Sequence, residues 1–269
     1  MRAAPGGERI AARLASPYVA GPAIADALTV ARDFAGHRIR SSIDYFGESV
    51  TEPAAADAVV ADYLQLAATL REAPDGTYLS VDLSHLGVDL PEGAAGRLRT
   101  IAEALPSGSA IQVGAEQNDR TDRILAAVTE VARTGAPVWA TVQANLRRSA
   151  ADGRALAEAG VPIRLVKGAY VEDPTSAYAW GDPTDLAFVG LAHDLHRAGA
   201  TIALATHDAV LRDALVRALA DVAVEMLMGV RPDDARALAA AGVPVRVYVP
   251  YGNNWFRYAM RRLAESRGK

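Results

Sequence analysis

Two adjacent arginines near the end of the chain stand beside a tyrosine at helical spacing. Tyr258, Arg261, Arg262 and Glu265 recur three or four positions apart, which places them on one face of a predicted helix. Two guanidinium groups beside an aromatic ring suit a small carboxylate, because they can hold it through charge-assisted, bidentate hydrogen bonds. The alternative is an ordinary solvated helix face, and the spacing alone leaves both interpretations open.

A single internal lysine marks the middle of the chain. The protein has 28 lysine and arginine residues, and only Lys167 and Lys269 are lysine. A compact ammonium and a planar guanidinium are not interchangeable in a tight site, so lysine at position 167 indicates a functional role. One such role is Schiff-base formation with a carbonyl substrate, as in a lyase or aldolase.

Composition excludes several classes of protein. The 269 residues include no cysteine, which rules out disulfides and thiolate metal sites, and the net charge of −4 without a basic run gives no sign of nucleic-acid binding. No apolar run reaches the roughly 18 residues of a membrane span, and the first residues lack the apolar core of a signal peptide. His193 and His196 face outward on a predicted helix, so we expect no metal site. The sequence predicts a cytoplasmic protein.

Short apolar runs alternate with helical patterns along the whole chain. The predicted strands are residues 41–45, 78–83, 110–114, 138–143, 163–166, 201–205, 222–227 and 245–249. This regular alternation predicts one (βα)8 barrel domain over residues 1–269, with an open, doubly wound sheet as the alternative. A helix over 24–34 is expected to cover the bottom or side of the barrel. Pro250 and Gly252 are expected to break the last strand before a C-terminal helix over the active site.

Polar side chains follow the predicted strands. In a barrel these strand ends lie on one face and form the active site. The side chains are Glu48, Asp82, Glu116, Gln143, Lys167 with Tyr170, His207 with Asp208, and Tyr248, with Leu227 after the seventh strand. The pattern predicts a site built from eight separate segments.

Four segments resemble the proline dehydrogenase family, the bacterial flavoenzymes that begin proline breakdown. Residues 248–265 contain Tyr-x-Pro-x-Gly, then Trp, then Tyr-x-x-Arg-Arg-x-x-Glu, and residues 164–170 read Arg-Leu-Val-Lys-Gly-Ala-Tyr. Shorter matches are Ala-Thr-His-Asp at 205–208 and Gly-Val-Arg-Pro at 229–232, with a weaker one at 44–48. The resemblance covers nearly the whole chain and also implies the (βα)8 fold.

The resemblance implies an FAD cofactor, for which no dinucleotide motif is present. Arg164 would lie against flavin N5, where a cation stabilises the anionic reduced flavin. The other residues implied to hold FAD are Gln143, Lys167, Ala169, Thr206, His207 and Glu265. Arg164 could instead pair with a carboxylate on a neighbouring strand, and His207 could be an ordinary core histidine.

The resemblance also implies the substrate and the reaction. Arg261 and Arg262 would bind the carboxylate of L-proline, and Glu48 would pair with an arginine of the site as a gate. The residues implied to wall the proline ring are Tyr170, Leu227, Tyr248 and Tyr258. Hydride transfer to flavin N5 would give pyrroline-5-carboxylate, and a membrane quinone would take the electrons at the inner membrane.

Two positions depart from the family pattern. Asp82 stands where the family usually has lysine, and Gly114 stands where it usually has aspartate. Together they make the site one charge more negative, and Gly114 is expected to open space for a larger substrate. Asp82 could also point away from the site and cap a turn. The alternatives are therefore flavin chemistry on another amino acid or cyclic amine, and a catalytically silent flavin or metabolite binder.

Overall fold

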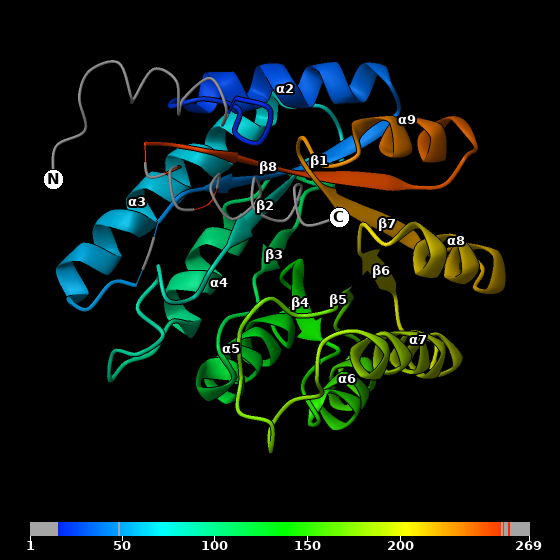
Figure 1. The fold of residues 1–269 in the computed structure, drawn as a ribbon. Helices are drawn as coiled ribbons and strands as arrows, with labels where there is room; N and C mark the ends of the chain where they lie inside the picture. Colours follow the sequence, from blue (N-terminus) through cyan, green and yellow to red (C-terminus); the bar gives the residue numbers. More distant parts are fainter. Residues whose placement is uncertain (1–15, 48, 254, 256–257, 259–269) are drawn as a thin grey trace, which may run out of the picture.

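The computed structural model describes residues 16–47, 49–253, 255 and 258. Within them, eight parallel strands follow one another in chain order and form a closed barrel, in which β1 pairs with β8. Figure 1 shows the helices packed around the outside of the strands. The predicted (βα)8 barrel is confirmed, and the open-sheet alternative is wrong.

The elements alternate as the sequence predicts. The strands are β1 (Ile39–Tyr45), β2 (Tyr78–Val81), β3 (Ile111–Val113), β4 (Val138–Gln143), β5 (Ile163–Val166), β6 (Ile202–Ala205), β7 (Ala223–Leu227) and β8 (Val245–Tyr251). The α-helices are α2 (Ile24–Gly36), α3 (Pro53–Thr69), α4 (Ala95–Glu103), α5 (Thr121–Ala132), α6 (Ser149–Glu158), α7 (Asp182–Arg197), α8 (Ala209–Ala218) and α9 (Pro232–Ala240). Two short 3-10 turns are η1 (Leu70–Glu72) and η2 (Asn118–Arg120).

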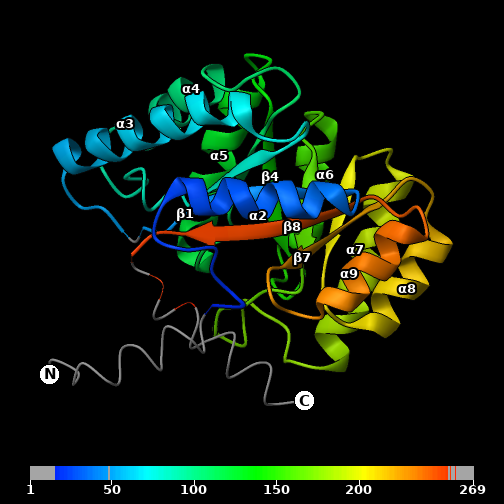
Figure 2. The ribbon, with the colours of Figure 1, turned by 90° about the horizontal axis from the view of Figure 1, so that it is seen from above.

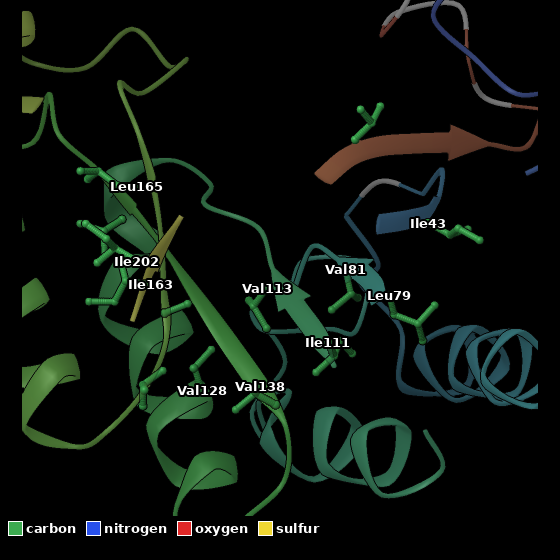
Figure 3. Close-up of a cluster of buried hydrophobic side chains, with 14 of the residues drawn as sticks. Ile43, Leu79, Val81, Ile111, Val113, Val128, Val138, Ile163, Leu165 and Ile202 are labelled. Atoms are coloured by element: carbon green, nitrogen blue, oxygen red, sulfur yellow. The ribbon is translucent and has the colours of Figure 1, made fainter. Parts of the chain in front are cut away.

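The apolar core lies between the strands and the helices. Side chains alternate across a strand, so Ile163 and Leu165 point outward and are fully buried under the helices, as Figure 3 shows. The residues at the alternate positions of the strands point into the barrel. Many of these side chains are polar, including Gln112 and Glu225. Barrel interiors are usually filled by branched apolar residues. Here the interior instead carries charge and hydrogen-bonding groups up to the mouth.

Glycines follow the ends of two helices. Gly160 and Gly242 follow α6 and α9 with φ of 69° and 88°, in the left-handed region that favours glycine. Each is followed within three residues by a strand, β5 or β8. Each glycine thus ends a helix and lets the chain turn into the next strand of the barrel.

Helix α2 covers one side of the barrel. It packs against β1 and β8 through the buried side chains of Ala27, Leu28 and Ala31, and Figure 2 shows it running beside β8. The predicted helix over 24–34 is confirmed, and its place is the side rather than the bottom. No helix in the described part of the chain is long and apolar enough to cross a bilayer.

Strand β8 is longer than the sequence predicts. The expected break at Pro250 is wrong, because the strand continues to Tyr251. The carbonyl of Pro250 accepts a hydrogen bond from Ala20 N at 2.9 Å, and that of Tyr251 accepts one from Phe46 N at 3.0 Å. Proline lacks only the donor, so these acceptors keep the strand end paired.

Candidate active site

Three adjacent strands bring the predicted cofactor residues to one edge of the barrel mouth. Gln143 at the end of β4 is in register with Val166 of β5, which is in register with Ala205 of β6. Lys167 and Thr206 follow directly after β5 and β6. Lys167 and Thr206 therefore stand one residue beyond the level of Gln143, on neighbouring strand ends.

Lys167 is held between two aspartates. Its Nζ lies 2.6 Å from Asp185 and 3.0 Å from Asp208. Burial alone would lower the pKa of Lys167, but the hydrogen bonds to Asp185 and Asp208 outweigh it and raise that pKa. The lysine therefore stays protonated, which disfavours Schiff-base chemistry because that requires a neutral amine. Asp185 was not predicted, because its only sequence signal is its place in the first turn of α7.

His207 ties the ends of two strands together. Its Nε2 accepts a hydrogen bond from Leu227 N at 2.9 Å, so the neutral ring carries its proton on Nδ1. Thr206 Oγ1 accepts from Asp208 N at 3.2 Å, and Asp208 in turn caps α8 through Val210 N and Leu211 N. These hydrogen bonds join the ends of β6 and β7 to the start of α8. The predicted contact of His207 with FAD stays a prediction.

Glu116 is buried beside the mouth and held by hydrogen bonds. It is 3% exposed, and its carboxylate accepts from Ser84 N at 2.8 Å and Arg120 Nη1 at 2.9 Å. Gln143 donates to its backbone carbonyl at 2.8 Å. Glu116 thus belongs to the scaffold of the predicted polar ring, and it supports Gln143.

Arg164 pairs with an acid across the barrel. Its Nε lies 2.8 Å from Oε2 of Glu225 on β7. Strand β6 separates β5 from β7, so this contact crosses the barrel interior. Arg164 thus pairs with a strand carboxylate, as the alternative to the flavin contact suggested, but the carboxylate lies two strands away and not on a neighbouring strand. Glu225 was missed, although a charged residue at an alternate position of an apolar strand is a signal for a polar interior.

A tyrosine and a buried aspartate stand on the opposite side of the mouth. Tyr248 donates its hydroxyl to Asp44 Oδ2 at 2.7 Å. Burial raises the pKa of Asp44 to about 6, against the lowering effects of the Tyr248 and Ser80 hydroxyls and of Arg164. Burial and the charge of Asp44 raise the pKa of Tyr248 well above its ordinary value. Asp44 was also missed, although it opens the weak family match at 44–48.

Asp82 fills the space beside Gly114. A Cβ at residue 114 would lie 1.9 Å from Asp82 Oδ1. The expected room for a larger substrate at Gly114 is therefore wrong, because the Asp82 carboxylate occupies it. The charge of Asp82 also contributes to raising the pKa of Tyr248, after burial and the charges of Asp44 and Tyr258. The placement of Asp82 in the substrate site stays a prediction.

Known proteins resemble this chain over almost its whole length. A family model described as "Proline dehydrogenase" matches residues 27–269. A proline dehydrogenase of Deinococcus radiodurans is 34% identical over 267 residues, which is 94% of this chain and 86% of the relative. Proline dehydrogenase 1 of Bacillus subtilis strain 168 is 31% identical over 96% of this chain and 88% of its own length. The chain belongs to the proline dehydrogenase family.

Solved structures of larger proteins share the family's barrel. Proline utilization A (PutA) from Bdellovibrio bacteriovorus, inactivated by N-propargylglycine, matches with a TM-score of 0.84 at 21% identity, over 94% of this chain and 32% of that chain. PutA from Corynebacterium freiburgense matches with a TM-score of 0.80 at 18% identity, over 95% and 31%. The chain thus spans about a third of the length of these PutA proteins, and the likeness confirms the fold.

The remaining residues of this proline dehydrogenase family member lie around Tyr248 and Lys167. Tyr258 is 9% exposed, and its ring centroid lies 5.2 Å from that of Phe46 and 5.9 Å from that of Tyr248. After Lys167, Ala169 is exposed and Tyr170 is partly buried. Glu48, Arg261, Arg262 and Glu265, with the rest of the predicted C-terminal helix, lie outside the described residues.

Proposed function

We propose that this protein oxidises L-proline to pyrroline-5-carboxylate, with noncovalently bound FAD as the hydride acceptor. Membership of the proline dehydrogenase family supports the reaction. The observation that carries the proposal is the division of the barrel mouth into two parts. The ends of β4 to β6 carry hydrogen-bonding and cationic groups, namely Gln143, Lys167 and Thr206. The ends of β1, β2 and β8 carry two carboxylates and a tyrosine, namely Asp44, Asp82 and Tyr248.

The residues at the ends of β4 to β6 fit a flavin. Arg164, Lys167 and Gln143 offer two cations and an amide to a ring system with carbonyl oxygens and N5. Beside Lys167, the first turns of α7 and α8 expose the apolar side chains of Leu186 (72%) and Val210 (78%). Apolar contacts with a few placed polar groups are typical of cofactor sites. The bound flavin supplies the two-electron acceptor, and Arg164 near N5 would favour its reduced form.

The opposite part of the mouth fits proline. We assign the carboxylate of proline to Arg261 and Arg262, and its ring to a wall of aromatic and apolar residues. These wall residues are Tyr170, Leu227, Tyr248 and Tyr258. Asp82 places a carboxylate at the mouth, where it would accept a hydrogen bond from the amine. The contribution of these side chains is to position the substrate and exclude water.

The acceptor of the electrons belongs to the same proposal. A membrane quinone would reoxidise the flavin, with the protein at the cytoplasmic face of the inner membrane, and Glu48 would gate the site by pairing with an arginine. These assignments rest on the family resemblance.

Anaerobic mixing of the purified protein with L-proline tests the proposal. We expect a yellow protein that releases FAD on heating, bleaches with L-proline, and forms pyrroline-5-carboxylate. Pyrrolidine, which lacks the carboxylate, is the matched control and should bleach the flavin far more slowly. A colourless protein after soaking with FAD, or a flavin that L-proline does not bleach, would refute the proposal.

A further inference from the structure

A buried glutamate lies below the mouth and is shared by three side chains. Glu225 on β7 is 5% exposed. Its Oε2 lies 2.8 Å from Arg164 Nε, and its Oε1 accepts from Gln112 Nε2 at 2.6 Å. The same Oε1 lies 3.7 Å from Arg246 Nε. These partners come from β5, β3 and β8, so the carboxylate stands in the middle of the barrel interior.

One partner of this glutamate is itself held in place. Arg246 is 7% exposed and donates through Nη1 to Ser41 O at 2.9 Å and Gly76 O at 2.7 Å. Its guanidinium carbon lies 3.4 Å from the ring centroid of Tyr78. Burial lowers the pKa of Arg246 and the charge of Glu225 opposes that shift. Arg246, which is in register with Glu225 on the adjacent strand, therefore gives Glu225 a fixed cationic partner.

Arg164 is the cation of this cluster whose charge reaches the mouth. Its side chain is 17% exposed, and its charge reaches Asp44 at the mouth, where it lowers the pKa of that carboxyl. Its buried Nε makes no well-aligned hydrogen bond with the described residues, so the contact with Glu225 is mainly ionic. Charge thus alternates along the interior from Arg246 through Glu225 and Arg164 to Asp44.

We infer that Glu225 is a positioning residue that holds Arg164 at the mouth and limits the positive charge that Arg164 presents to the flavin. The inference rests on the proposed function, because it needs a flavin above Arg164. A rigid second partner is what keeps such a group in its productive orientation. The carboxylate also offsets part of the potential of Arg164, which keeps the flavin less electrophilic at N5 than an unpaired arginine would make it.

Sulfite binding to the oxidised holoprotein tests the charge effect. Sulfite adds to flavin N5 and leaves a negative charge on the adduct, so its affinity reports the local potential without any turnover. Glu225→Gln keeps the shape and removes the charge, and one charge at about 10 Å in an effective dielectric near 20 should tighten sulfite binding by roughly tenfold. Glu158→Gln, on the exposed end of α6, is the control and should bind sulfite like the wild type.

Glu225→Asp tests the positioning effect, since it keeps the charge and shortens the side chain. We expect sulfite affinity near that of the wild type and a lower kcat/KM for L-proline, a combination that a merely structural role does not produce. Unchanged sulfite affinity in Glu225→Gln, or unchanged kcat/KM in Glu225→Asp, would overturn the inference. The proposed function would still stand if L-proline bleaches the flavin of the wild type. A wild type without flavin would overturn both. If Glu225→Gln does not fold, the Glu225→Asp result decides.

Discussion

The side chain of residue 114 and the carboxylate of Asp82 compete for one volume. With alanine at 114, the new Cβ would lie 1.9 Å from Asp82 Oδ1, whereas ordinary contacts begin near 3.4 Å, so the carboxylate must move by about 1.5 Å (3.4 − 1.9). The nearest backbone atom, Val81 O, is 3.6 Å from that Cβ. Gly114 is not among the glycines with positive φ, so alanine introduces no backbone strain. Gly114→Ala therefore displaces the carboxylate without disturbing the barrel.

This displacement should lower the activity on L-proline. A hydrogen bond between Asp82 and a charged amine is worth about 1.5–3 kcal/mol, so its loss should reduce kcat/KM by roughly 10- to 100-fold. Gly114→Ala and Asp82→Ala should give similar losses, and the double variant should be no worse than Asp82→Ala, because both changes remove the same contact. Steady-state kinetics measure this, with thermal melts to confirm folding. Gly96→Ala is the control, since its Cβ meets nothing within 4 Å.

The reciprocal exchange gives a sharper test of the same geometry. Gly114→Asp alone places two carboxylates in one volume and should be poorly active. Adding Asp82→Lys restores the arrangement that the family resemblance implies and should recover most of the activity, with a coupling energy of about 1–3 kcal/mol. Strictly additive losses, or wild-type kcat/KM in Gly114→Ala, would refute the placement of Asp82 in the substrate site. A wild-type kcat/KM of about 10⁴ M⁻¹s⁻¹ or more would show that both departures are tolerated.

Three further predictions concern the cofactor, the substrate carboxylate and stability. Lys167→Ala should weaken FAD binding by roughly 10- to 100-fold, since a charge-assisted hydrogen bond is worth about 1.5–3 kcal/mol. FAD titration measures this, with Arg133→Ala at an exposed position as the control. Full FAD occupancy in Lys167→Ala would remove Lys167 from the cofactor site. Arg262→Ala should raise KM for L-proline far more than Arg257→Ala, which lies off the polar stripe, and equal small effects would favour the solvated face. The folded-state pKa of Asp44, about 6 against an ordinary 3.8, means that the folded protein holds a proton that the unfolded chain releases, so stability falls as pH rises through this window. Urea melts at two pH values measure this as the free energy of unfolding of Asp44→Asn minus that of the wild type. We expect this difference to be about 1.4 kcal/mol larger at pH 8 than at pH 5. A difference that does not change with pH would contradict the raised pKa.

Local pattern was enough to predict the barrel and much of the mouth. Strand–helix alternation and glycines after helices, such as Gly160, depend on residues that are close together in the chain, so the sequence displays them directly. The segment 164–170 also placed Lys167 at a strand end, because a parallel barrel brings every strand end to one face.

What each charged side chain contacts was decided only by the tertiary structure. The sequence suggested an open space at Gly114, but the closeness of β2 and β3 puts the Asp82 carboxylate in it. It left open whether Arg164 contacts a flavin or a strand carboxylate, and the barrel brings Glu225 of β7 within 2.8 Å of Arg164 Nε. Such contacts depend on strand register and on how far a side chain reaches across the barrel. Neither is encoded in the spacing of residues along the chain, because the partners come from strands whose separation is set by the closure of the sheet.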